Sequence, residues 1–258
     1  QGFEVEVYAD QQGAGSGLAF VSWFTFDKTT GGAERQRWYT MSGPMRSGEP
    51  VASLSIYENT GGNFNAPPVT SARNVGTATL SFDTCVTGVL SYAFTDGSAR
   101  AGVIPLTRLT PSVTCSTTAA RPTNADFALS GNWFDPATSG QGLTVEVNGG
   151  AGVLFAAWYT YAPSGATAGA AGQRWFTAQG PLATGSRNVA VTIYETTGGL
   201  FDAQTFPVPS TVAVGTGTLS FQSCSNAKLD FSFTGGSNSG STGSISLVRV
   251  GPVPPGCV

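Results

Sequence analysis

The chain has 258 residues, of which 40% are hydrophobic and only 10% are Asp, Glu, Lys or Arg. A net charge of −3 leaves no basic stripe that could neutralise a phosphate backbone, which argues against nucleic-acid binding. The 35 glycines together with many Ser, Thr and Ala residues suit strands and tight turns more than exposed helices. The absence of histidine removes the usual general base near neutral pH. Composition therefore predicts an all-β protein and disfavours Ser-His-Asp or Cys-His catalysis.

The first strands of the chain recur in its second half. Residues 1–7 and 36–40 read as strands, and closely similar segments occur at 141–147 and 173–177. Because the order of the segments is also kept, the repeat predicts two copies of one module.

Segments between and after these strands repeat as well. Residues 18–26 and 153–161 are apolar on both faces, as expected of strands whose outer side meets the other module or a partner. An Ile-Tyr-Glu sequence followed by a Gly-Gly turn occurs at 56–62 and again at 193–199. Later strands, such as residues 90–94, alternate apolar and polar side chains, which is typical of half-buried strands.

These patterns favour two tandem antiparallel up-and-down β-barrels. From Trp133 onward we count about eight short strands joined by turns, with no helical crossover. We expect the first module at residues 1–115, a linker at 116–125 and the second module at 126–258. The first copy begins inside the motif that opens the second, so we expect it to lack its opening strand, either by truncation or because another segment supplies it.

The four cysteines repeat with the modules. Their spacing is too wide for a Cys-x-x-Cys zinc site, and no histidine could complete a mixed site, so disulfides are the better interpretation. Disulfides persist outside the cytoplasm, which predicts a secreted or cell-surface protein. The longest apolar stretch is too short to span a bilayer as a helix. The predicted pairs are Cys85–Cys115 and Cys224–Cys257.

The opening Gly131-x-Trp133, the meander of about eight strands and Arg249 on the final strand resemble the calycin group of lipocalin-like and avidin-like barrels. In that group the final-strand arginine stacks over the opening tryptophan and closes one end of the barrel. The resemblance implies this role for Arg249, and Arg108 lies equivalently in the first copy.

A second resemblance is more specific. Residues 133–142 and 158–161 are similar to an uncharacterised repeated module of secreted proteins from Gram-negative bacteria. This resemblance implies a location, and no reaction comes with it.

Glu58 and Glu195 are acids kept in both copies, on the face expected to point inward. A duplicated pair of acids could serve glycoside hydrolysis, but a structural ion pair is the better interpretation because an unpaired buried charge costs several kcal/mol. Glu6 and Glu146 alternate with valines and are expected to face solvent. No metal or cofactor is expected. The expected ion-pair partners are Arg108 or Arg37 for Glu58, and Arg249 or Arg174 for Glu195.

Repeated aromatic residues are the remaining candidates for binding. Trp38 and Tyr57 alternate away from the inward residues of their strands, so such rings could stack on a sugar or contact another protein. Packing in the core and lining of an interior ligand cavity are the alternative uses. The predicted ligand-binding residues are Trp23, Trp38, Tyr57, Trp158, Trp175 and Tyr194.

The sequence therefore predicts a non-enzymatic, secreted or cell-surface interaction protein that binds a glycan or a protein surface, with two copies raising avidity. A structural subunit of an extracellular fibre or sheath, assembling by strand complementation, is one alternative. A carrier of a small apolar ligand inside the barrel is the other.

Overall fold

The computed structural model describes residues 1–109, 125–163, 169–203, 206–254 and 257. Strands dominate these residues, and no helix among them is long and apolar enough to cross a membrane. The helical segments that they contain are short 3-10 turns: η1 (Ala33–Arg35), η2 (Ala125–Leu129), η3 (Pro136–Thr138) and η4 (Gly169–Gly172).

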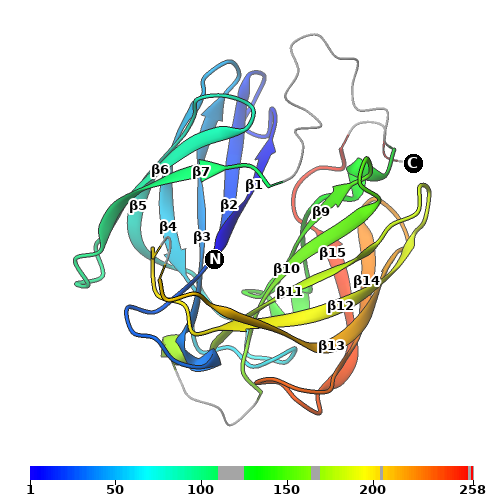
Figure 1. The fold of residues 1–258 in the computed structure, drawn as a ribbon. Helices are drawn as coiled ribbons and strands as arrows, with labels where there is room; N and C mark the ends of the chain where they lie inside the picture. Colours follow the sequence, from blue (N-terminus) through cyan, green and yellow to red (C-terminus); the bar gives the residue numbers. More distant parts are fainter. Residues whose placement is uncertain (110–124, 164–168, 204–205, 255–256, 258) are drawn as a thin grey trace.

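The first half of the chain forms one curled antiparallel sheet of seven strands, here called the half-barrel (Figure 1). Strands that follow one another in sequence are neighbours throughout, so the connectivity is a meander. Among the described residues no strand joins the two outer strands, and the sheet stays open there. The strands are β1 (Gly2–Tyr8), β2 (Ser16–Phe26), β3 (Gln36–Arg46), β4 (Val51–Glu58), β5 (Arg73–Phe82), β6 (Thr87–Phe94) and β7 (Ala101–Thr107).

The second half closes into an eight-stranded antiparallel barrel. The last strand returns to the first, with Arg249 opposite Trp133 and Val248 opposite Phe134. The predicted antiparallel meander is thus confirmed in both halves, and the predicted closure only in the second. The strands are β8 (Gly131–Phe134), β9 (Gly142–Asn148), β10 (Val153–Tyr161), β11 (Gln173–Pro181), β12 (Asn188–Thr197), β13 (Ser210–Phe221), β14 (Asn226–Phe233) and β15 (Thr242–Arg249).

Alternating side chains build a separate core in each module. In β6, Leu90, Tyr92 and Phe94 are buried while the residues between them face solvent, because successive side chains of a strand point to opposite faces. The half-barrel core contains Trp23, and the barrel core contains its counterpart Trp158. Each module therefore has an apolar interior of its own.

Both modules carry a β-bulge at the same place, between Ile56 and Tyr57 in β4 and between Ile193 and Tyr194 in β12. Pairing of β3 with β4 covers just three residues of each strand, and β11 with β12 is equally short. The first residues of β3 and β11 therefore extend beyond β4 and β12, so part of their backbone has no neighbouring strand on that side. The other module packs against this part of the backbone.

Candidate functional site

The outer faces of the two modules pack on each other through an aromatic cluster, here called the interface cluster. Trp38 and Trp175 occupy equivalent positions on β3 and β11, and both are fully buried. Each ring contacts aromatic rings of the other module at centroid distances between 5.2 and 5.8 Å. Its buried members are Phe26, Trp38, Ala157, Tyr159, Tyr161 and Trp175.

The two indoles make reciprocal hydrogen bonds. Trp38 donates from Nε1 to the carbonyl of Thr160 at 3.1 Å, and Trp175 donates from Nε1 to the carbonyl of Thr25 at 2.8 Å. Thr25 and Thr160 are themselves equivalent in the repeat. The contact therefore occurs twice, as in the interface of a two-fold symmetric dimer.

Two equivalent glutamines satisfy the backbone that the short β3 and β11 pairings leave free. The side-chain amide of Gln36 donates to the carbonyl of Trp175 at 2.9 Å and accepts from the amide nitrogen of the same residue at 3.2 Å. Gln173 donates to the carbonyls of Trp38 and Asn59, each at 3.0 Å. A buried backbone group without a hydrogen-bond partner costs free energy. Each glutamine side chain avoids this cost, because it supplies hydrogen bonds that a neighbouring strand would otherwise make.

The modules also exchange loops. Phe64, between β4 and β5, packs on Trp158 and Phe233 in the barrel. Its counterpart Phe201, between β12 and β13, packs on Trp23 and Phe94 in the half-barrel. Each module thus inserts one phenylalanine into the core of the other.

Glycines permit this close approach. A Cβ atom added to Gly62 would lie 2.2 Å from Tyr161, and one added to Gly199 would lie 2.1 Å from Phe26. The rings that they approach are buried in the interface cluster and cannot move aside. The second glycine of each Gly-Gly turn is therefore required for the exchanged loop to lie against the interface cluster.

Acidic residues of β1 occupy the edge of the same interface. Glu6 accepts hydrogen bonds from the backbone nitrogen of Asn132 at 2.9 Å and from its side-chain amide at 2.6 Å. Burial raises the pKa of Glu6, although bonds from Tyr8 and Asn132 oppose the shift. Burial together with the nearby charge of Glu146 raises the pKa of Glu4 to about 8. The expectation that Glu6 faces solvent was wrong, because the barrel covers the outer face of β1.

The six aromatic residues predicted to bind a ligand fall into three environments. Trp23 and Trp158 lie inside the two cores, and Trp38 and Trp175 lie between the modules, so all four indoles are covered by this chain. Tyr57 and Tyr194 are half-buried beside the two bulges. Trp38 and Trp175 thus contact the other module of the same chain, and binding of an external ligand by any of the six residues stays a prediction.

The glutamate partners differ from those expected. Glu58 pairs with Arg73 at 2.9 Å, rather than with Arg108 or Arg37, because the bulge before it turns the side chain toward the edge of β5. Arg37 pairs instead with Asp27.

Glu195 is buried, and it accepts hydrogen bonds from the backbone nitrogen of Ser237 at 3.0 Å and from the Ser237 hydroxyl. Its expected partner Arg174 donates to the carbonyls of Ala171 and Gln173. The predicted salt bridges of Glu195 with Arg174 or Arg249 are replaced by these neutral partners.

Arg249 closes one end of the barrel. Its guanidinium lies 4.4 Å from the ring centroid of Trp133, as the calycin resemblance implies. It also donates to the carbonyls of Cys224 and Ala128, each at 2.6 Å, and of Ser130 at 2.7 Å. Its counterpart Arg108 is exposed.

The predicted disulfide Cys224–Cys257 is present, with 6.0 Å between the Cα atoms. It links the start of the β13–β14 turn region to the segment after β15. Cys85 is also disulfide-bonded, and its predicted partner Cys115 lies outside the described residues.

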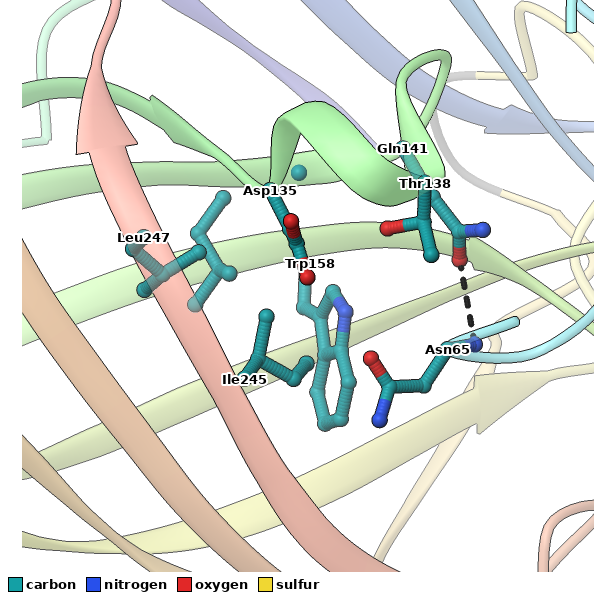
Figure 2. Close-up of a pocket in the computed structure, with 9 residues that line it drawn as sticks. Asn65, Asp135, Thr138, Gln141, Trp158, Ile245 and Leu247 are labelled. Atoms are coloured by element: carbon teal, nitrogen blue, oxygen red, sulfur yellow. Dashed lines mark hydrogen bonds between the residues drawn. The ribbon is translucent and has the colours of Figure 1, made fainter. Parts of the chain in front are cut away.

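A small cavity lies at one end of the barrel, beside Trp158 and Ile245 (Figure 2). Its volume is about 10 Å³, which is the space of roughly one water molecule. Asn65 reaches it from the half-barrel and donates its backbone N–H to the Gln141 side chain at 3.3 Å. The described residues contain no cluster of three or more side chains suited to a metal ion.

Sequence reasoning missed the glutamines and the exchanged loops. The signal was present, because Gln-Arg-Trp and the Gly-Gly turn with its phenylalanine are kept in both copies. The chain matches no protein-family model, no curated protein and no solved structure.

Proposed function

We propose that the chain is a non-catalytic, extracellular interaction protein whose modules recognise a like module through the interface cluster. The observation that carries this proposal is the reciprocity of the contacts. Both indole bonds, both glutamines and both inserted phenylalanines occur in equivalent pairs. A surface that fits its own repeat is the property of a module that assembles with copies of itself.

Two buried tryptophans give the contact anchors of the kind that support specific recognition. A buried tryptophan removes roughly 150–250 Å² from water, which is worth at most about 4–6 kcal/mol at about 25 cal/mol per Å². Trp38 and Trp175 are both anchors of this kind, each with its polar N–H paired. Aromatic anchors in fully desolvated pockets carry most of the energy in protein interfaces.

Other roles have less support. A glycan platform needs exposed aromatic rings, whereas the four candidate tryptophans are buried. A carrier needs an enclosed interior space, whereas the barrel cavity is water-sized and the larger pocket of about 490 Å³ beside Leu54, Ala78 and Tyr92 of the half-barrel is largely open to solvent. The disulfides favour a location outside the cytoplasm.

Exchange of modules between whole chains tests the proposal. Chains carrying a donor or an acceptor fluorophore are unfolded together, disulfides intact, and refolded at about 1 mM, near the effective concentration that a flexible linker imposes. We expect mixed dimers, seen as energy transfer in a chromatographic peak of doubled mass. Refolding at about 1 μM should give monomers, because pairing within one chain then dominates.

Matched variants separate recognition from non-specific association. The double variant Trp38→Ala/Trp175→Ala should give no mixed dimers, whereas Tyr57→Ala/Tyr194→Ala should exchange as the parent does. Monomers alone at the higher concentration, or equal exchange in the tryptophan variant, would refute the proposal. Saturable binding to a glycan array that is lost in the tyrosine variant would favour the glycan function instead.

A further inference from the structure

The way in which the barrel is closed indicates what kind of segment would close the half-barrel. Its opening strand β8 lies between β9 and β15 and pairs with both. Trp133 stands opposite Leu143 on one side and Arg249 on the other. This four-residue strand, Gly-Asn-Trp-Phe, is what closes the barrel.

The half-barrel has the two strands that would flank such a segment. β1 corresponds to β9, with Phe3 and Val5 at the positions of Leu143 and Val145. β7 corresponds to β15, and Arg108 follows it at the position of Arg249. Among the described residues, β1 pairs with β2 alone and β7 with β6 alone, so each strand presents an unpaired backbone edge. The space between these edges is here called the slot.

Solvent exposure shows that the slot opens onto apolar side chains. Val5 and Val7 are 39% and 46% exposed, whereas their counterparts Val145 and Val147 in the closed barrel are 2% and 0% exposed. Ile104 and Leu106 on β7 are likewise less buried than Ile245 and Leu247 on β15, which are 5% and 2% exposed. The same residues that β8 covers in the barrel are uncovered in the half-barrel.

Arg108, at the end of β7, lowers the pKa of Glu4 on β1 by its positive charge, although burial and the charge of Glu146 raise that pKa overall. Arg249 has an indole beneath it, whereas Arg108 is exposed. An aromatic ring brought into the slot would give Arg108 the cation–π contact that its counterpart makes.

We infer that the slot between β1 and β7 binds an extended polypeptide segment with the Gly-x-Trp-Phe pattern of β8. The segment runs antiparallel to both flanking strands, and its tryptophan points inward beneath Arg108. Glycine is required two residues before the tryptophan, since Gly131 has a φ of +137° and an added Cβ would lie 2.5 Å from Arg249 Nη1. The folded barrel of a second copy cannot supply this segment, because its own β9 and β15 hold β8.

Module pairing contacts β1 through the outward Glu6 side chain rather than through its free backbone edge, so the peptide experiment and the module-exchange experiment test different contacts. The probe is a synthetic peptide with the sequence of residues 129–136, Leu-Ser-Gly-Asn-Trp-Phe-Asp-Pro. Binding to the whole chain is followed by calorimetry, and its location by hydrogen exchange of the β1 and β7 amides. We expect saturable binding with new protection confined to these two strands, because strand addition pairs edge amides.

Peptide and protein variants identify the contacts. A Trp→Ala peptide should bind at least about tenfold more weakly, and a Gly→Val peptide should not bind. Arg108→Ala should weaken binding of the parent peptide by about tenfold. In this variant the Trp→Ala change in the peptide should cause a smaller further loss of affinity than it does with the parent chain. Arg46→Ala, an exposed arginine on a non-edge strand, should leave affinity unchanged.

Three results would overturn the inference. They are the absence of saturable binding up to about 1 mM peptide, protection at strands other than β1 and β7, and equal affinity for the parent and Trp→Ala peptides. A failed module exchange with successful peptide binding would remove the proposed function alone.

Discussion

Replacing Trp175 with alanine removes the central ring that the barrel contributes to the interface cluster. Trp175 is 1% exposed, and its ring lies 5.2 Å from that of Phe24 and 5.4 Å from that of Phe26. Its Nε1 also donates to the carbonyl of Thr25, which would be left buried without this partner. Truncation of a buried aromatic residue costs about 3–5 kcal/mol, and we expect a loss in this range.

Urea unfolding of the whole chain, followed by fluorescence and circular dichroism, measures this loss. Trp38→Ala should have a similar effect, because the contacts are reciprocal. Trp175→Phe keeps most of the ring and loses the N–H, so it should cost about 1–2 kcal/mol. A loss below about 1 kcal/mol in Trp175→Ala, typical of a surface substitution, would refute the reasoning.

Three further predictions concern other features. The pKa of Glu4 is raised to about 8 in the folded chain, so the folded state favours the protonated form. The contribution of Glu4 to stability should be fully present below its ordinary pKa of 4.5 and be lost as pH rises through about 8, and Glu4→Gln should remove this part of the pH dependence in urea titrations at several pH values. Gly199→Ala should destabilise by about 1–3 kcal/mol in thermal unfolding, since its Cβ would lie 2.1 Å from Phe26. Cys224→Ala/Cys257→Ala should cost about 4 kcal/mol in urea unfolding, since the bridge spans 33 residues.

The first two of these predictions have a control variant, and each of the three has a contradicting result. Glu49→Gln, at an exposed turn residue, should keep the parental pH dependence, and a Glu4→Gln curve that matches the parent would disprove the assignment. Gly235→Ala, where an added Cβ meets nothing within 4 Å, should change stability by less than about 0.5 kcal/mol. Equal losses of stability in Gly199→Ala and Gly235→Ala would contradict the argument from close packing. An unchanged urea midpoint in Cys224→Ala/Cys257→Ala would contradict the argument from the disulfide.

Much of the architecture could be predicted from the repeat. Period-two alternation located strands such as β6 and β14, and the short turns between them specified a meander. The stacking of Arg249 on Trp133 followed from the resemblance to the calycin group. Cys224–Cys257 followed from the repeat of the cysteines. Such features depend on local sequence or on one recognisable motif.

The interface could not be predicted in the same way, because it depends on neighbours far apart in the sequence. Alternation places Trp38 on the outer face, but it does not say that the other module covers that face. The partner of Glu58 was missed because the bulge after Ile56 changes the register, which alternation alone does not reveal. Gln36 has no sequence signal beyond its repetition at Gln173.

The hydrogen exchange of the two indole N–H groups at the interface tests the central claim most directly. Trp38 and Trp175 bond to carbonyls of opposite modules in one reciprocal contact, so separation of the modules must expose both. We predict that the two indoles exchange slowly and with similar protection, and that Trp38→Phe accelerates exchange at Trp175. Rapid exchange of both indoles in the parent chain, or protection of Trp175 that is unaffected by Trp38→Phe, would contradict the pairing of the modules through this face.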